Sequence, residues 1–263
     1  MSIQGNQRPK TKDQRLKRLN YMQKKEWFAT WFDTKYYHIL YQDRDDDEAQ
    51  RFMKNLVDFL KLKKEAKILD LACGRGRHSV YLNSLDFKVK GVDLSKNSIQ
   101  YAKQFEKRGL KFKVHDMRKP FKKKYHAIFN LFTSFGYFDD DKTNIQVLTN
   151  IKNGLKKNGI AVIDFMNIET VTKNLTPKEI VIKDNISFHI TREIIHNKIV
   201  KNIRFQVENQ DFHFTEQVQC LTLDTIKNYI SKAGLKLSHT FGDYNLNSFD
   251  VNTSKRLILV VSK

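Results

Sequence analysis

Cysteine is scarce in this chain, and long apolar runs are absent from it. Its 263 residues include two cysteines, Cys73 and Cys220, which lie far apart and outside any Cys-x-x-Cys pair. The sequence therefore offers no zinc knuckle and no disulfide framework, and no metal site is expected. No run of 18 apolar residues occurs, so no transmembrane helix is expected. Residues 1–25 are polar and basic, unlike a secretory signal, and we expect a cytoplasmic location.

Acidic residues are few relative to basic ones. The chain has 29 Asp and Glu against 48 Lys and Arg, a formal net charge of +19. Such a charge invites a nucleic-acid partner. However, lysines number 36 and arginines 12, whereas phosphate-binding sites favour the arginine fork. Residues 1–25 alone contribute +7. The composition favours a solvated basic surface over a specific nucleic-acid site.

The first 62 residues divide into an arm and a helical segment. Residues 1–22 lack periodic apolar positions, and we expect a flexible basic arm there. The main domain then covers residues 23–263. A helix is predicted over residues 46–62, which start with acids that suit a helix N-terminus. Between the arm and this helix lies a segment that is too apolar to stay in water, with these aromatic residues: Trp27, Phe28, Trp31, Phe32, Tyr36, Tyr37 and Tyr41.

Strands and helices alternate from residue 67 to residue 165. Short apolar strands are predicted over residues 67–72, 88–93, 111–115, 126–131 and 159–165. Helices are predicted over residues 75–85, 95–107 and 140–155. In the second helix, Ser95 is the N-cap, and Ile99, Ala102 and Phe105 should face inward. This alternation implies right-handed βαβ units and an α/β fold with a mainly parallel sheet.

Residues 178–220 break this alternation. Apolar residues occur there at every second position, and His196-Asn197-Lys198 is typical of a turn. We interpret the segment as an antiparallel β insertion. Its own core would contain four aromatic residues: Phe188, Phe205, Phe212 and Phe214. A helix over residues 223–233, ended by Gly234, and two strands over about 235–241 and 255–261 follow.

The most specific motif is Asp70-Leu71-Ala72-Cys73-Gly74-Arg75-Gly76. An apolar strand ends in an acid, and a Gly-x-Gly turn and a helix follow. The glycines let the backbone turn sharply and approach a ligand. The helix N-terminus offers unpaired N–H groups to an anion. Several nucleotide ligands suit such a turn, so the glycines alone identify none of them.

Polar residues also end the next three strands. Asp93 ends the second strand, where a carboxylate can accept both ribose hydroxyls of an adenosine. Asp116 and Met117 follow the third, where an acid can accept from the adenine amine and the next N–H can donate to the ring. Asn130 ends the fourth. Because parallel strands end at the same edge of a sheet, we expect one site there.

Over about residues 65–165, the chain resembles the class I S-adenosylmethionine (SAM) dependent methyltransferases. That family has an acid-x-x-x-Gly-x-Gly turn after the first strand and acids after the second and third. The resemblance implies a Rossmann-like sheet of seven mostly parallel strands with helices on both faces and an antiparallel last strand. It also implies SAM as the cofactor and S-adenosylhomocysteine as the product. One departure is His78, directly after Arg77, where many members have a third glycine nearby.

The resemblance assigns roles on the methionine side of SAM. Asp70, Ala72, Gly74 and Gly76 would line the methionine part. Residues 23–62 resemble the N-terminal lid of members that act on small molecules. In such lids an aromatic hydroxyl often reaches the SAM carboxylate, and Tyr37 is the candidate here.

On the adenosine side, the resemblance places Asp93 at the ribose and packs Leu94 on the adenine. Asp116 and Met117 would bind the adenine edge.

Near the transferred methyl group, Asn130 and Leu131 would pass under the sulfonium. Tyr137 and His38 are weak candidates for a general base, and His196 and His213 can also be considered. An amine acceptor that binds neutral needs little help from a base.

The β insertion resembles the sheet that caps the acceptor pocket in members that methylate small acceptors, including amino-sugar N-methyltransferases. We therefore expect methyl transfer to nitrogen or oxygen of a small molecule. The alternatives are an RNA or protein methyltransferase, a non-catalytic SAM-binding or RNA-binding module, and an NAD-dependent oxidoreductase. The last is disfavoured, because Ser79 takes the place of the third glycine in G-x-G-x-x-G. No membrane partner is expected, and a homodimer through the insertion is left open.

Overall fold

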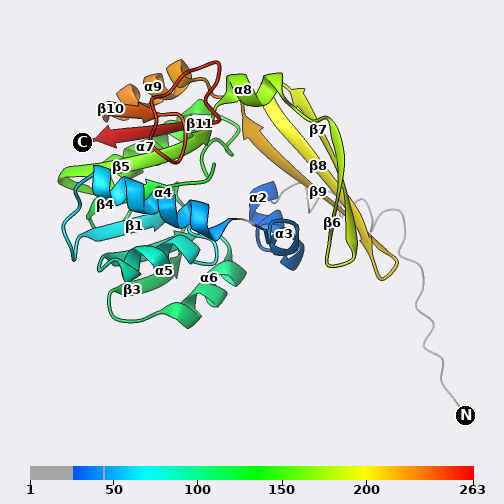
Figure 1. The fold of residues 1–263 in the computed structure, drawn as a ribbon, viewed down its shortest axis with the longest axis horizontal. Helices are drawn as coiled ribbons and strands as arrows, with labels where there is room; N and C mark the ends of the chain where they lie inside the picture. The colour runs from blue at the N-terminus through cyan, green and yellow to red at the C-terminus, as the bar shows by residue number, and fades with distance from the viewer. Residues whose placement is uncertain (1–25, 44) are drawn as a thin grey trace, which may run out of the picture.

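In the computed structural model, which describes residues 26–43 and 45–263, seven strands form one sheet in the order β10-β11-β5-β4-β1-β2-β3 (Figure 1). The strands are β1 (Lys67–Leu71), β2 (Lys88–Asp93), β3 (Leu110–Val114), β4 (Tyr125–Asn130), β5 (Leu155–Met166), β10 (Lys236–Phe241) and β11 (Arg256–Ser262). β11 runs antiparallel to both of its neighbours, β5 and β10. β1 to β5 pair in parallel. The predicted α/β fold with a mostly parallel sheet is therefore confirmed.

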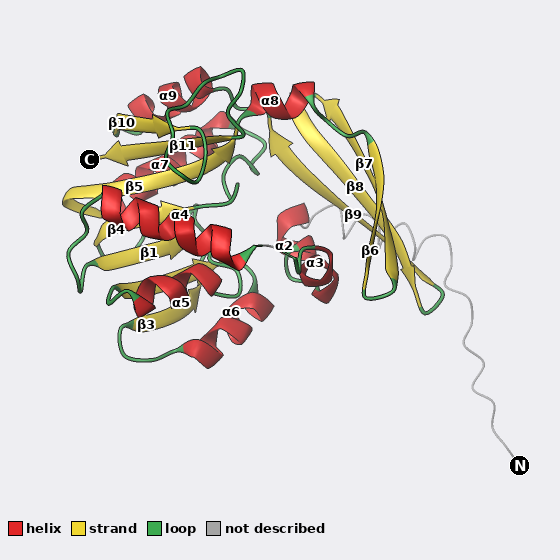
Figure 2. Cartoon of the chain, in the orientation of Figure 1, coloured by secondary structure: helices red, strands yellow, loops and turns green. Residues whose placement is uncertain are grey.

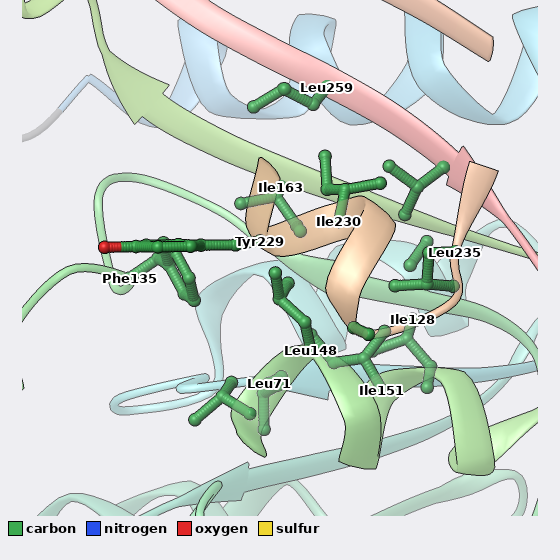
Figure 3. Packing of buried hydrophobic residues seen from close by; sticks show 14 of the residues in the cluster. Leu71, Ile128, Phe135, Leu148, Ile151, Ile163, Tyr229, Ile230, Leu235 and Leu259 are labelled. Carbon is green, nitrogen blue, oxygen red and sulfur yellow. The ribbon is translucent and has the colours of Figure 1, made fainter. Parts of the chain in front are cut away.

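Helices cover both faces of this sheet. One face packs against α4 (Asp46–Phe59), α5 (Arg77–Ser84) and α6 (Lys96–Ala102), which continues into the 3₁₀ helix η1 (Lys103–Phe105). The other face packs against α7 (Asp141–Gly154) and α9 (Leu223–Lys232). Figure 3 shows this second core, in which Leu148 and Ile151 of α7 and Ile230 of α9 meet the sheet residues Ile128 and Ile163. Burying these apolar stripes stabilises the three layers.

The insertion is a separate sheet of four antiparallel strands. It comprises β6 (Lys178–Lys183), β7 (Ile186–Ile195), β8 (Lys198–Val207) and β9 (Gln210–Gln219), and α8 (Ile168–Lys173) leads into it. His196 and Asn197 have φ values of 47° and 60°, so the predicted turn between β7 and β8 is confirmed. Two short helices, α2 (Trp27–Trp31) and α3 (Lys35–Leu40), lie between this sheet and the large one (Figure 2).

The apolar face of the insertion packs against α2 and α3. Phe188 and Phe205 are buried in one cluster with Trp31. The ring of Phe214 lies 4.6 Å from that of Trp31, between centroids. Phe205 is in ring contact with Phe188, Phe212 and Phe214, so the four phenylalanines pack together as predicted, but the insertion shares this core with α2 and α3. A single sheet has one apolar face that must be covered by another element, and residues 26–43 supply that cover.

Two helix ends differ from the prediction. α6 ends at Ala102 and tightens into η1, which turns Phe105 outward, so that its side chain is 40% exposed beside Tyr101. The inward position predicted for Phe105 is wrong, because a 3₁₀ turn has 3.0 residues rather than 3.6. α4 ends at Phe59, before the predicted residue 62.

Three further predictions concern a membrane span, a homodimer and the N-terminal arm. Among the described helices, none combines the length and apolarity needed to cross a membrane. β6 is an edge strand with Ile180 and Ile182 exposed, and the homodimer through the insertion stays a prediction. The predicted basic arm, residues 1–22, lies outside the described residues.

Candidate active site

The turn after β1 contains three residues in the left-handed region. The φ angles of Ala72, Gly74 and Gly76 are 65°, 54° and 86°. Ala72 pays a steric penalty there that glycine does not. Its N–H and that of Cys73 donate to the Val92 carbonyl of β2, at 2.8 and 3.0 Å. These bonds hold the strained turn against the end of the neighbouring strand.

Asp70 lies at the base of this turn and is 2% exposed. Its Oδ2 accepts a hydrogen bond of 2.6 Å from the Ser79 hydroxyl of α5. Burial raises the pKa of Asp70 to about 6. The bond from Ser79 opposes this rise, and the nearby charge of Asp93 adds to it. Ser79, which replaces the third glycine, therefore has a partner in the motif itself.

Asp93 organises both the turn and the start of the next helix. Its Oδ2 accepts from Gly74 N and its Oδ1 from Ser95 N, each at 2.8 Å. Burial raises the pKa of this carboxylate, against the effect of those backbone bonds. Ser95 caps α6, as predicted, by accepting from Ser98 N at 3.0 Å.

Asp33, between α2 and α3, docks on the same helix end. Its Oδ1 accepts from Ser95 Oγ at 2.6 Å and from Asn97 N at 3.0 Å. Asn97 Nδ2 returns a bond of 3.0 Å to the Asp33 carbonyl. The two helices between residues 27 and 40 are thus tied to the strand end that carries Asp93.

Asp116 follows β3 and is engaged by Arg118. Nε of Arg118 lies 3.0 and 3.1 Å from the two carboxylate oxygens, and Nη2 lies 2.7 Å from Oδ2. Burial alone would raise the pKa of Asp116, but the bonds and charge of Arg118 bring it below its ordinary value. Arg118 also donates to Glu26, at 2.9 Å for Nη2. The backbone N–H of Arg118 also donates to Oδ1 at 2.9 Å, so this one residue fixes both oxygens of Asp116.

Hydrogen bonds of buried side chains hold the end of β4 and the segment that follows it. Asn130 is buried, and its Nδ2 donates to the Leu71 carbonyl at 3.0 Å, which ties β4 to β1. Phe132 and Thr133 both have positive φ, 57° and 59°. Asp164 Oδ2 accepts from Phe132 N at 2.7 Å. These contacts present Leu131 and Phe132 to the edge of the sheet.

A cavity of about 490 Å³ lies at this edge. Its walls come from the strand ends, from α2 and α3, and from β9 of the insertion. The wall includes these predicted cofactor residues: Tyr37, Asp70, Ala72, Gly74, Asp93, Leu94, Asp116, Met117 and Leu131. Gly76 and Asn130 are not among its wall residues. A Cβ on Gly76 would lie 2.6 Å from the Phe112 ring, so this glycine allows close packing instead.

The two weak base candidates also lie on the cavity wall. The Tyr137 hydroxyl donates to the Thr133 carbonyl, and its ring lies 5.1 Å from that of Trp27. His38 Nε2 lies 3.4 Å from Ser98 Oγ. His196 and His213 are not wall residues of this cavity.

Several residues of the site escaped the sequence analysis. Asp33, between α2 and α3, and Glu216, a wall residue from β9, lie in segments whose position relative to the sheet no local pattern predicts. Arg118 follows Asp116 by two residues, and its spacing could have suggested the pair. Asp164 carried a clear signal, because it is an acid inside the apolar strand Val162-Ile163-Asp164-Phe165. Such an acid needs a buried partner.

The residues at the cavity fit an adenosyl sulfonium ligand. The volume of the cavity is typical of small-molecule sites. A Cβ built on Gly74 would meet nothing within 4 Å, so the turn has open space beside it. Carboxylates for hydroxyl and amine donors end neighbouring strands, and Trp27, Tyr37 and Tyr137 offer ring faces that suit a cation.

Comparison with known proteins agrees with this fit. The family model described as a methyltransferase domain matches residues 62–206. Protein 235L of Invertebrate iridescent virus 6, named as a methyltransferase, is 26% identical over 146 residues, which cover 54% of this chain and 55% of that protein. The alignment thus spans about half the length of that relative.

Two solved structures share the fold. One is a SAM-dependent methyltransferase from Clostridium acetobutylicum, with a TM-score of 0.73 at 19% identity, covering 86% of this chain and 95% of that one. The other is the sugar N-methyltransferase KedS8 from Streptoalloteichus, with a TM-score of 0.65 at 15% identity, covering 100% and 96%. Because the family model covers more than half of the chain, the chain belongs to the methyltransferase-domain family, and it shares the fold of a SAM-dependent methyltransferase.

Proposed function

We propose that this enzyme methylates a nitrogen or oxygen atom of a small-molecule acceptor. The supporting observation is the enclosure of the cavity. Residues of α2, α3 and β9 cover the strand ends and leave about 490 Å³, which suits the cofactor and a small acceptor better than a folded polymer. KedS8, which has the same fold, is a sugar N-methyltransferase.

Under this proposal, Asp93 holds the ribose hydroxyls. Its two oxygens already accept from Gly74 N and Ser95 N, which fixes the carboxylate plane before a ligand arrives. Leu94 packs on the adenine, while Asp116 and Met117 face its edge. Arg118 keeps Asp116 ionised and oriented as an acceptor.

On the methionine side, Asp70, Ala72 and Gly74 line the amino-acid part of the cofactor, and Tyr37 faces its carboxylate from the lid. Gly76 and Asn130 act from behind the wall, through packing on Phe112 and through the bond to Leu71.

Bound SAM supplies an electrophilic methyl group on a positive sulfonium. The chain's task is then alignment and exclusion of water. The rings of Tyr137 and Trp27 stabilise positive charge in the cavity. A neutral amine needs no base to react, whereas a hydroxyl acceptor gives its proton to a group within hydrogen-bond reach, for which Tyr137 and His38 are the candidates.

The first test is calorimetry of SAM binding to the Asp93→Ala variant. Hydrogen bonds to a charged group contribute about 1.5–3 kcal/mol each, so the loss of two should lower the affinity by about 100-fold or more. Asp58→Ala, on the exposed side of α4, is the matched control and should bind as the wild type does. Unchanged affinity of Asp93→Ala would refute the ribose assignment.

The acceptor class is tested by release of S-adenosylhomocysteine with a panel of amines, hydroxylated sugars and tRNA. Turnover with a small amine or sugar supports the proposal. Turnover confined to tRNA, weakening steeply with salt, would replace it with an RNA methyltransferase.

A further inference from the structure

β6 is the edge strand of the four-stranded insertion, and it carries two exposed isoleucines. Ile180 is 61% exposed and Ile182 is 66% exposed. Among the described residues, no strand pairs with the side of β6 that faces away from β7. Proteins usually cover such an edge or protect it, because its unpaired N–H and C=O groups can bind another strand. The edge of β6 is therefore available to a strand of another molecule.

The hairpin of β6 and β7 shows which backbone groups of β6 are free. Directly before β6, the Pro177 carbonyl accepts from Arg192 N at 2.8 Å, in the same register as the rest of the hairpin. Hydrogen-bonded pairs alternate along an antiparallel ladder, so residues 179, 181 and 183 bond to β7. The N–H and C=O groups of residues 178, 180 and 182 point to the free edge. In the described part of the chain, no backbone bond outside the sheet ladders reaches them.

These free groups restrict how a second copy of the chain can pair with the edge. In a twofold dimer, the two β6 strands lie antiparallel about the axis. Hydrogen bonds across the axis need free groups on both strands, so even-numbered residues of one copy must pair with even-numbered residues of the other. Near the middle of the strand, this condition leaves three registers, in which residue 180, 181 or 182 lies opposite its own copy.

The apolar side chains suit the register centred on Val181. In this register, Ile180 of each copy lies opposite Ile182 of the other, and Val181 lies opposite itself. The exposed isoleucines of both copies then form one apolar strip on the outer face of the joined sheets. Cross-strand pairs of this kind stabilise a sheet. In the register centred on residue 180, Ile182 lies opposite Lys178 instead.

The charges favour the same register. In it, Glu179 lies opposite Lys183, and Lys178 lies opposite Asp184 of the adjoining turn. Each match occurs twice by symmetry. In the two other registers, Glu179 or Lys183 lies opposite Val181. Opposite charges across a strand pair are stabilising, so the edge of β6 is complementary to itself in one register, as an isologous interface requires.

We propose that β6 pairs with β6 of a second copy of this chain, with Val181 opposite itself, and that the two four-stranded sheets become one continuous sheet. This interface goes beyond the proposed function and does not depend on the acceptor. The contact is confined to one strand edge, so it belongs to the small and weak class of interfaces. Association should therefore depend on protein concentration.

Cysteine substitution tests the register. Val181→Cys places two thiols in a non-hydrogen-bonded pair, where the Cα atoms lie about 4.5 Å apart, within the reach of a disulfide. Ile180→Cys places them on a diagonal of about 7–8 Å, although residue 180 is the more exposed. On mild oxidation of the full chain, Val181→Cys should form covalent dimers at least about 10-fold faster than Ile180→Cys on non-reducing gels. The wild type, with Cys73 and Cys220, gives the background rate.

Sedimentation velocity from about 5 to 200 μM tests the association itself, and the wild type should shift from monomer to dimer. Ile180→Pro removes an N–H at the free edge and leaves the ladder with β7 intact, so dimerisation should weaken by at least about 10-fold. Lys178→Glu puts like charges opposite each other at Asp184 and should also weaken the dimer. Lys157→Glu makes the same charge change at an exposed position of β5 and should dimerise as the wild type does.

Circular dichroism checks that each variant is folded. A wild type that stays monomeric at the highest concentration would overturn the proposal, as would a dimer that neither Ile180→Pro nor Lys178→Glu weakens. Faster linkage through residue 180 than through residue 181 would overturn the register. Calorimetry of SAM binding on the same preparations tests the proposed function separately, because a monomer that binds SAM refutes only the interface.

Discussion

Arg256 Nε donates a hydrogen bond of 2.8 Å to Asp164 Oδ1 beneath the segment that follows β4. Asp164 is fully buried in β5, and Arg256 opens β11. The guanidinium also donates to Thr133 Oγ1 at 2.8 Å, while the other carboxylate oxygen accepts from Phe132 N. One ion pair between neighbouring strands therefore holds two consecutive left-handed residues, the first of which, Phe132, is a wall residue of the cavity at the strand ends.

Arg256→Met should destabilise the fold by about 3–5 kcal/mol, because it leaves the buried charge of Asp164 without its partner. Urea unfolding followed by circular dichroism measures the change. Arg204→Met, on the exposed outer face of β8, is the control and should stay within about 0.5 kcal/mol of the wild type. Equal midpoints for the two variants would contradict the role given to the ion pair.

Asp70→Asn should change how stability depends on pH. Burial raises the pKa of Asp70 from 3.8 to about 6, so the folded state holds the proton more tightly than the unfolded state does. The contribution of this group is then fully present below about pH 4 and is lost as pH rises through 6. The stability of the wild type relative to Asp70→Asn should fall by about 3 kcal/mol at most between pH 4 and pH 7.

Urea unfolding of both proteins at intervals of half a pH unit checks this prediction. Subtracting the free energy of unfolding of Asp70→Asn from that of the wild type cancels the pH dependence that the other carboxylates give to both proteins. A difference that is flat with pH, or that grows as pH rises, would show that Asp70 is not a buried acid with a raised pKa.

Gly76→Ala and Gly74→Ala form a matched pair in one turn. At Gly76, an added Cβ meets the Phe112 ring at 2.6 Å and φ is 86°, so we expect a loss of about 2–4 kcal/mol from crowding and backbone strain. At Gly74 nothing lies within 4 Å and φ is 54°, so only strain of about 1–2 kcal/mol remains. Thermal unfolding gives the stabilities, and a larger loss for Gly74→Ala would contradict the packing role of Gly76.

Asp33→Ala should loosen the lid without unfolding the domain. It removes the acceptor for Ser95 Oγ and Asn97 N, bonds that contribute about 1–2 kcal/mol, as an N-cap does. Trypsin should then cleave after the exposed Lys35 about 10-fold faster than in the wild type. Asp43→Ala removes an exposed ion pair with Lys183 from the same region, and trypsin should cleave this variant at the wild-type rate. Identical rates for Asp33→Ala and Asp43→Ala would show that Asp33 does not anchor the lid.

Much of the wall of the cavity could be predicted from the sequence. Asp70, Asp93 and Asp116 each come at or just after the end of an apolar strand, and parallel strands end at one edge of the sheet. The same local rule placed Ala72 and Gly74 on the cavity wall, while apolar residues at every second position identified the insertion as antiparallel strands. It was less reliable for Gly76 and Asn130, which end in the layer behind the wall.

By itself, the sequence determined which segments are strands, which faces are apolar and which polar residues stand at strand ends, because these depend on periodicity and on neighbours in the chain. Only the tertiary structure decided what covers each apolar face. Tyr41 and Glu216 are 175 residues apart and share a hydrogen bond at the wall of the cavity. A pattern shows that a face must be buried but does not name its partner, since hydrophobic burial has no direction and many surfaces satisfy it equally.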